Sequence, residues 1–260
     1  MTARLAGQRI LVTRPSAQAA LLCQLIESVG GIARRFPTLE IDPLQPDPTK
    51  LDQALHSDWL IFTSSNAVDF AIKAFNGKMP RFDQTRIAAV GEATAQALRN
   101  ADWNVHCVPT SHFSSEGLLA EAMLQNVKGC QCVIVRGLGG RDKLERGLLD
   151  RGASVSYLEV YRRERPDTNN TDLAAEIAAH QLDAISITSV EALSNLLEML
   201  DANSQCLIKD IHLIVVSQRI ADSARQLGFK HIAVSQRPGD REIVETLTTL
   251  FNGENSGRRN

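Results

Sequence analysis

The sequence lacks the features that mark several large classes of protein. It has no apolar run approaching the roughly 20 residues that cross a bilayer, and its formal net charge is only -2. We therefore expect neither a membrane-spanning segment nor a nucleic-acid-binding surface. The first residues lack the apolar core and cleavage site of a signal peptide, so we expect a cytoplasmic protein. With 43% hydrophobic and 22% charged residues, the composition argues against a disordered chain.

Cysteine is also scarce. The five cysteines are scattered and odd in number, so they do not form a disulfide framework and fit a reducing compartment. Cys130 and Cys132 should face one side of a strand as small buried side chains, since a metal or redox site would need Cys-x-x-Cys spacing and further ligands. His106, Cys107 and His112 are close in sequence, but the first two should face opposite sides of a strand. We expect no metal site.

What the sequence does contain is a regular alternation of two patterns. Continuous apolar runs of four to six residues alternate with amphipathic segments of ten to fifteen. This alternation is typical of a parallel sheet covered by helices and predicts an α/β fold. The expected early elements are a helix near residues 17–29 and strands near residues 9–13, 32–36, 59–62, 86–90 and 104–108.

The alternating pattern occurs twice along the chain, and 260 residues are enough for two domains of ordinary size. The matching stretches are RILVTRP with CVIVRGL, FTSSNAV with ITSVEAL, AVGEATAQAL with VVSQRIADSA, and VPTSHFSSEGLL with VSQRPGDREIVETL. The last three pairs are offset by 125 or 126 residues, so the register holds over most of a half. Two similar domains are predicted.

Each copy also contains an extended, proline-bearing segment, FPTLEIDPLQPDPT in the first and SYLEVYRRERPDT in the second. Both look like linkers. If each carried the chain from one domain to the other, residues 1–36 would join the last three strands of the second copy. The residue pattern alone does not distinguish this crossover from two domains in tandem.

Candidate ligand-binding residues follow the strands, because ligands of open α/β sheets bind beyond the carboxyl ends of the strands, where helix N-termini offer unpaired N–H groups. No nucleophile, base and acid occur together there, and the hydroxyls, glycines and arginines suit a carboxylated ligand. Any single Thr or Ser could instead be a helix N-cap. The candidates are Thr13, Arg14, Thr63, Ser64, Ser65, Asn66, Gly91, Arg136, Gly137, Thr188, Ser189, Ser217, Gln218 and Arg219.

Two arginines and two tyrosines among these segments allow more than one interpretation. Arg14 and Arg136 occupy equivalent places in the two copies, so they either face one another across a cleft or lie solvated on the surface. Tyr157 and Tyr161 should lie on one face of a strand. Tyr161 could simply bury its ring at an interface with its hydroxyl in water.

A dinucleotide site is a weaker alternative. Gly137-x-Gly139 opens a helix, and Glu159 ends the next strand where a ribose-binding acid belongs. The third glycine of the motif is missing, however, and its place is held by Asp142, whose charge would repel a pyrophosphate.

Taken together, the stretches ILVTRP, LIFTSSNAV, AVGEATA, VIVRG, LEVYRR, AISITSVEAL and the closing HIAVSQRP resemble the uroporphyrinogen-III synthase family of a proteobacterial type. The resemblance runs from about Arg9 to Leu250. It implies two flavodoxin-like α/β domains joined by a two-stranded linker, with the chain crossing twice. The implied boundaries are residues 1–36 with 166–260 for one domain, 42–157 for the other, and 37–41 and 158–165 for the linker strands.

The resemblance also implies a reaction and a substrate. The family cyclises hydroxymethylbilane, a linear tetrapyrrole, to uroporphyrinogen III, with loss of water and inversion of ring D through a spiro intermediate, without cofactor or metal. The enzyme is then a hydro-lyase of porphyrin and heme biosynthesis, expected to act as a monomer. The tyrosine of the family's cleft corresponds, by the VYR match, to Tyr161, whose protonated phenol would donate to the departing hydroxyl. Family members vary at the corner that matches Ser217, Gln218 and Arg219. A bilobed ligand-binding protein and a dinucleotide-dependent oxidoreductase remain as alternatives.

Overall fold

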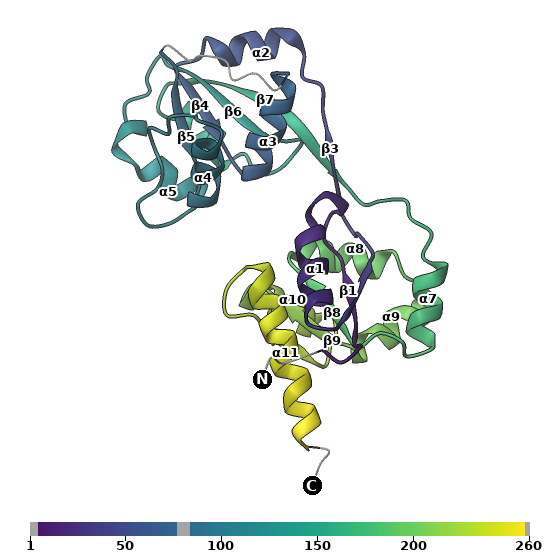
Figure 1. Cartoon of the computed structure of the whole chain (residues 1–260). Coiled ribbons are helices and arrows are strands. Elements are labelled where there is room, and N and C mark those ends of the chain that lie inside the picture. Colours follow the sequence, from purple (N-terminus) through teal and green to yellow (C-terminus); the bar gives the residue numbers. More distant parts are fainter. Residues whose placement is uncertain (1–4, 77–83, 258–260) are drawn as a thin grey trace. The chain divides into compact units, whose positions relative to one another are not determined.

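The computed structural model describes residues 5–76 and 84–257. By its contacts, the chain divides into two compact units (Figure 1). The first unit combines Met1–Glu40 with Glu164–Asn260, and the second unit is Ile41–Arg163. Residues 1–4, where a signal peptide would begin, lie outside the described part of the chain.

The first unit contains a five-stranded sheet in the order β10-β9-β8-β1-β2, in which every neighbouring pair is parallel. The inner strands are the apolar runs RILV, AISI and HLIV, which are almost wholly buried because helices cover both faces. The strands are β1 (Arg9–Val12), β2 (Ile32–Arg35), β8 (Ala184–Ile187), β9 (His212–Val215) and β10 (Ile232–Val234).

Two apolar cores lie on opposite faces of this sheet. Leu11 belongs to one core, whereas Ile10 and Val12 belong to the other, as the two-residue period of a strand requires. The helices α1 (Ala20–Ser28) and α11 (Asp240–Gly257) contribute to the second core. The core that contains Leu11, on the other face, is built with α7 (Thr171–Ala178), α8 (Val190–Glu198), α10 (Gln218–Gln226) and the 3₁₀ segment η3 (Ile208–Asp210). The unit also contains α9 (Ala202–Leu207) and η1 (Ser16–Gln18).

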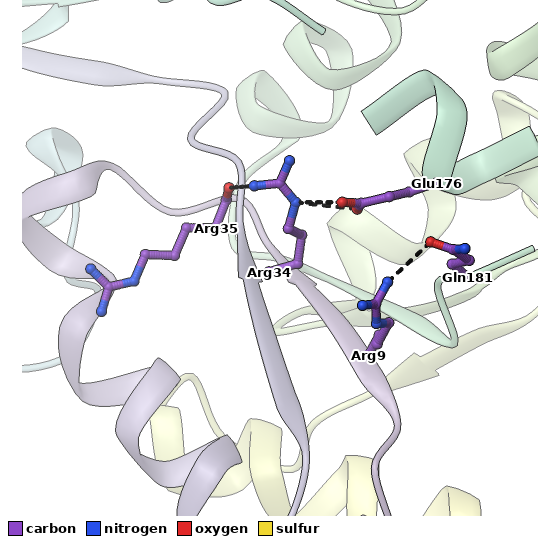
Figure 2. Close-up of polar contacts among 5 residues, drawn as sticks. All are labelled: Arg9, Arg34, Arg35, Glu176 and Gln181. Atoms are coloured by element: carbon purple, nitrogen blue, oxygen red, sulfur yellow. Dashed lines mark hydrogen bonds and ion pairs between the residues drawn. The ribbon is translucent and has the colours of Figure 1, made fainter. Parts of the chain in front are cut away.

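Polar contacts join the beginning of the chain to its later part within the first unit. Figure 2 shows the Nε of Arg34 on β2, which lies 3.0 Å from a carboxylate oxygen of Glu176 on α7. Arg9 on β1 donates from Nη1 to the Oε1 of Gln181 over 3.1 Å. These partners are 142 and 172 residues apart in sequence. The contacts therefore help to hold β1 and β2 in the sheet formed with β8, β9 and β10.

The second unit contains a five-stranded sheet in the order β3-β7-β6-β4-β5, in which β4 pairs parallel with β5 and β6, and β6 pairs parallel with β7. Its strands are β3 (Glu40–Pro43), β4 (Trp59–Phe62), β5 (Arg86–Ala89), β6 (Gln131–Gly137) and β7 (Ser154–Glu164). Its helices are α2 (Pro48–Leu55), α3 (Ser65–Ala74), α4 (Glu92–Asn100), α5 (Ser115–Ala120), η2 (Ala122–Leu124) and α6 (Lys143–Leu149). One face packs on α2, α3 and α4, and the other on α5 and α6.

The order of the strands explains the internal repeat. The sequence matches pair β1 with β6, β4 with β8, and β5 with β9, and the two sheets then show the same order, β9-β8-β1-β2 and β5-β4-β6-β7. The predicted α/β class with two similar parallel sheets is confirmed. The assignment of residues 37–41 and 158–165 as linker strands, and the domain limits drawn from it, stay predictions.

The strand expected at residues 104–108 is wrong. Only one isolated bridge forms there, between Ala88 and Cys107. The Nδ1 of His106 accepts the N–H of Ile87 over 3.0 Å, so a side chain takes a donor that a regular ladder would give to a main-chain carbonyl.

Candidate active site

Tyr161 lies on β7 at a break in the regular pairing of that strand. Arg136 on β6 pairs with Glu159, but the next residue, Gly137, pairs with Tyr161, so Val160 is an extra residue on β7. An extra residue of this kind reverses the facing of the side chains that follow it. The prediction that Tyr157 and Tyr161 share a face is therefore wrong: Tyr157 packs with the core under α5 and α6, and Tyr161 with the core under α2, α3 and α4.

The ring of Tyr161 fills the space above Gly137. A Cβ atom on Gly137 would lie 2.5 Å from Cε2 and 2.6 Å from Cζ of the tyrosine. These distances are shorter than the contacts that Cβ atoms make in folded proteins, so a side chain at this position would clash with the ring. Phe70 of α3 contacts the ring at a centroid distance of 5.4 Å. Tyr161 is only 3% exposed. The buried ring therefore packs on both Gly137 and Phe70, and its position depends on the absence of a side chain at Gly137.

The hydroxyl of Tyr161 reaches the start of α3. It lies 3.2 Å from the Oγ of Ser64, and the same Oγ accepts the N–H of Ala67 over 3.1 Å as the N-cap of the helix. The Nη2 of Arg163 donates to the Tyr161 hydroxyl over 3.5 Å. The hydroxyl of Tyr161 on β7 thus contacts the start of α3, although Ser64 and Tyr161 are 97 residues apart in sequence.

The remaining predicted residues of the second unit lie at the same carboxyl edge of its sheet. Thr63 follows β4 and donates from its hydroxyl to the carbonyl of Val135 over 3.2 Å. Gly91 follows β5 and is the N-cap of α4. Ser65 and Asn66 form the first turn of α3. The first-turn N–H groups of a helix are donors for anions, so this edge presents the starts of two helices, of which α3 contacts Tyr161 through Ser64.

In the first unit, the equivalent corners begin helices in the same way. Ser189 caps α8 by accepting the N–H of Ala192 over 3.0 Å, and Ser217 is the N-cap of α10. Thr13 is fully buried and donates to the carbonyl of Ser186 over 2.7 Å, which ties β1 to β8. Thr188 directly precedes Ser189, at the end of β8. On α10, Gln218 donates to Asp222 over 2.8 Å, and Arg219 is exposed.

Arg14 and Arg136 each pair with a carboxylate of their own unit. The Nη2 of Arg14 lies 2.7 Å from the Oδ1 of Asp240, the first residue of α11, and their side chains are only 20% and 10% exposed. Among the described residues, the Nε of Arg14 and the Oδ1 of Asp240 make no hydrogen bond of good geometry, so the pair is close but poorly aligned. Neither arginine is a solvated surface residue.

Arg136 lies in a small polar cluster of the second unit. Its guanidinium carbon stacks 4.0 Å from the ring centre of Tyr157, and its Nη2 lies 3.4 Å from Glu159, which faces it across the β6–β7 pair. Tyr157 donates to Glu145 on α6 over 2.7 Å. Burial, reinforced by the hydrogen bond to Glu145, raises the pKa of Tyr157 to about 12. The cluster holds Arg136 at the end of β6 as a neutralised cation.

Three contact residues, Asp240, Arg163 and Phe70, were not predicted from the sequence. Asp240 carries a weak signal, because it begins the helix that follows a turn-forming Arg-Pro-Gly stretch. Arg163 is one of three arginines within four residues of Tyr161, and Phe70 is one of several apolar residues on α3. No local pattern distinguishes these two.

A cavity of about 380 Å³ lies elsewhere, in the first unit. It is lined by residues of β10 and α11, including Val234, Glu242 and Thr246. None of its lining residues was predicted as a site residue. The candidate site residues therefore lie at strand ends and not at this cavity.

No metal-binding group of three or more His, Cys, Asp or Glu side chains occurs among residues 5–76 and 84–257. Cys130 and Cys132 pack in an apolar core as expected, and burial raises the pKa of the Cys132 thiol to about 12. A thiol of this kind is a poor nucleophile and a poor ligand. In the described part of the chain, no helix has the length and apolar character that crossing a bilayer requires.

The dinucleotide alternative is not favoured by this geometry. Gly137 provides room for the ring of Tyr161 rather than for a pyrophosphate. Asp142 is the N-cap of α6 and so brings a negative charge to the place where the phosphates would bind.

Comparisons with known proteins agree on one family. The family model described as Uroporphyrinogen-III synthase HemD matches residues 20–245. The uroporphyrinogen-III synthase of Escherichia coli (strain K12) is 32% identical over 245 residues, which cover 92% of this chain and 99% of that protein. The protein of the same name from Salmonella typhimurium (strain LT2) is 31% identical over 248 residues, covering 92% of this chain and 99% of its own length.

Solved structures show the same fold. A crystal structure of a mutant uroporphyrinogen III synthase from the extremely thermophilic bacterium Thermus thermophilus gives a TM-score of 0.65 at 19% identity, covering 96% of this chain and 100% of that one. The uroporphyrinogen-III synthetase of Helicobacter pylori 26695 gives 0.59 at 17% identity, covering 94% of this chain and 99% of that one. Sequence and fold agree, and the chain belongs to the uroporphyrinogen-III synthase family.

Proposed function

We propose that this chain is a hydro-lyase that cyclises hydroxymethylbilane to uroporphyrinogen III, with loss of water and inversion of ring D, and that Tyr161 is its proton donor. Membership of the family supports the reaction. The observation that supports the role of Tyr161 is its phenol, whose ring packs on Gly137 and Phe70 and whose hydroxyl contacts Ser64 at the start of α3. A group held in this way needs no reorganisation when it donates its proton.

The substrate's chemistry fits the donors at the strand ends. Each pyrrole ring carries an acetate and a propionate, so the ligand presents many carboxylates. In the second unit, N–H groups at the starts of α3 and α4 are suited to bind such groups, with Thr63, Ser65, Asn66 and Gly91 in the binding segments. In the first unit, Thr188, Ser189, Ser217, Gln218 and Arg219 belong to the corresponding segments. Thr13 would then act by holding β1 to β8.

Arg14 and Arg136 are proposed to bind substrate carboxylates although each already has an acidic partner. A guanidinium has five N–H donors, and a single carboxylate engages at most two of them. The contact between Arg136 and Glu159 is long, 3.4 Å, and Asp240 engages one terminal nitrogen of Arg14, its Nη2. Donor capacity therefore remains, and the acid prevents an uncompensated buried charge when the substrate is absent.

The reaction requires steering more than activation. The free substrate closes spontaneously to isomer I, so the enzyme must bind a conformation in which the substituted carbon of ring D is attacked. We further propose that the protein works in the cytoplasm as a monomer and without a cofactor. Its five cysteines are all unpaired, which fits a reducing compartment.

One assay tests this function. Purified protein is mixed with hydroxymethylbilane, and isomers I and III are separated after oxidation to the porphyrins. Formation of isomer III excludes a protein that only binds ligand, and turnover without added nicotinamide excludes the oxidoreductase. Isomer I alone, at the uncatalysed rate, would reject the proposal.

Tyr161→Phe tests the proton donor separately. The change keeps the ring packed on Gly137 and removes only the hydroxyl. Turnover should fall at least about tenfold, which corresponds to about 1.4 kcal/mol of barrier, and isomer I should rise as the uncatalysed closure continues. A variant with unchanged rate, isomer ratio and thermal stability would make Tyr161 a packing residue.

A further inference from the structure

Arg163 contacts the one group that the proposed mechanism uses as an acid. Its Nη2 donates to the Tyr161 hydroxyl over 3.5 Å, and its guanidinium carbon lies 5.7 Å from the centre of the tyrosine ring. Tyr161 is buried whereas Arg163 is exposed, so the hydroxyl lies where the buried ring meets the surface of the second unit. The tyrosine oxygen therefore has a cationic neighbour in addition to Ser64.

The hydrogen-bond inventory determines where the phenolic proton can go. Arg163 can only donate, so its contact uses a lone pair of the tyrosine oxygen. The Oγ of Ser64 already accepts the N–H of Ala67, which leaves its own proton available for the tyrosine oxygen. In this arrangement Tyr161 accepts from Ser64 and Arg163, and its own proton is free to point toward the substrate.

Charge appears on this oxygen during the reaction. As the O–H bond of Tyr161 breaks, its proton passes to the substrate's hydroxymethyl oxygen, the carbon–oxygen bond breaks, and water leaves. A phenolate remains until the macrocycle closes, when the hydrogen-bearing terminal carbon of ring D, which forms the last bond after the substituted carbon has reacted, releases one proton and restores the phenol. Between these two events, a negative charge lies beside the guanidinium of Arg163 and the hydroxyl of Ser64.

We propose that Arg163 is a positioning residue for the reaction, which orients the Tyr161 hydroxyl and stabilises the phenolate formed when its proton leaves. This inference rests on the proposed role of Tyr161. The 3.5 Å contact is long for the neutral phenol, whereas charge-assisted N–H···O hydrogen bonds shorten to about 2.7–2.9 Å. An interaction that is weak with the neutral group and strong with the charged one lowers the barrier rather than the substrate's dissociation constant.

The test removes the guanidinium and its charge while keeping an unbranched apolar side chain. Arg163→Met should lower kcat at least about tenfold with little change in KM, since it removes a charge-assisted hydrogen bond made in the transition state. Arg163→Lys should recover part of the loss, because an ammonium supplies the charge without the planar fork. Arg162→Met is the matched control: it removes the same charge from the neighbouring position on β7 and should leave kcat near that of the wild type.

A double-mutant cycle decides whether Arg163 acts through Tyr161. In the Tyr161→Phe background the hydroxyl is absent, so Arg163→Met should change kcat by less than about twofold. An equal loss in both backgrounds, or a rise in KM with unchanged kcat, would overturn the proposal, because Arg163 would then bind substrate itself. Equal effects of Arg162→Met and Arg163→Met would also overturn it.

The outcome is separable from the proposed function. If Tyr161→Phe lowers turnover but Arg163→Met does not, the role of Tyr161 stands and only the role of Arg163 fails. If Tyr161→Phe has wild-type turnover, both roles fail, although the isomer assay of the wild type still reports the reaction. Thermal denaturation of every variant checks that each is folded under the assay conditions.

Discussion

Gly137→Ala is a sharp test of how the candidate site is built. Gly137 has no positive φ, so alanine suits its backbone and the only new element is one methyl group. That methyl carbon would lie 2.5 Å from Cε2 and 2.6 Å from Cζ of Tyr161. Carbon atoms in ordinary contact are about 3.5–4.0 Å apart. The tyrosine ring must therefore retreat by roughly 1 Å, or β6 and β7 must separate.

A movement of this size affects both stability and rate. Tyr161 is buried and packs against Phe70 at a centroid distance of 5.4 Å, so overpacking here should cost about 1–3 kcal/mol. The hydroxyl is 3.2 Å from Ser64, already near the limit of a hydrogen bond, and a shift of about 1 Å breaks the contact. A misplacement of about 1 Å can cost about a hundredfold in rate, so we expect turnover to fall by at least about tenfold.

The assay compares kcat, the ratio of isomers III and I, and the urea midpoint with those of Gly147→Ala. A Cβ on Gly147 of α6 would lie 2.5 Å from Cδ1 of Leu119, so the crowding is equally severe, but it is directed at a leucine of the other core. Gly147→Ala should lose some stability, offset in part by helix propensity, and keep its turnover. Wild-type kcat in Gly137→Ala, or equal loss of kcat in both variants, would refute the reasoning.

Four further outcomes are expected. The free energy of unfolding should fall between pH 10 and about 12, because Tyr157 ionises near pH 10 in the unfolded chain, whereas its folded pKa of about 12 keeps it neutral. Urea unfolding should show a smaller fall in Tyr157→Phe. An equal fall in that variant would assign the effect to other groups. Asp240→Ala should destabilise the protein by roughly 3 kcal/mol, because it leaves Arg14 mostly buried without its acid; the double variant with Arg14→Met should regain part of this in thermal unfolding, and no regain would mean the two are not coupled. Arg136→Met should raise KM about tenfold or more and lower kcat less, as measured by initial rates with hydroxymethylbilane; an unchanged KM would remove Arg136 from the binding residues. Dialysis against a chelator should leave the rate intact, and recovery of a lost rate only by added metal would contradict this.

Much of the fold was predictable because its signals are local. Parallel strands covered on both faces must be apolar throughout, and WLIF and AISI, the fully buried β4 and β8, show this directly in the sequence. The repeat of the strand-end corners correctly indicated two similar sheets. The expected strand at residues 104–108 failed because the side chain of His106 takes the N–H of Ile87, a contact that no propensity describes.

The candidate site was predictable only in part. Ser64 and Ser189 could be placed at helix starts, because a Thr-Ser pair between an apolar run and a helical pattern is an N-cap signal. The pairing of Arg14 with Asp240 could not be predicted, since the two are more than 200 positions apart and no charge pattern links them. The contact of Arg163 with the tyrosine hydroxyl could not be predicted either, because nothing in the sequence distinguishes Arg163 from the arginines next to it.

By itself, the sequence determined the α/β class, the repeated strand-to-helix corners and the family, because alternation, capping and motif order are properties of neighbouring residues. Only the tertiary structure decided which way Tyr161 faces. A two-residue period placed it beside Tyr157, whereas the extra residue on β7 directs it onto Gly137 and toward Ser64, 97 positions away. A register shift depends on how two strands distant in sequence pack together, and the free energy of that packing is a property of the folded pair rather than of either strand alone.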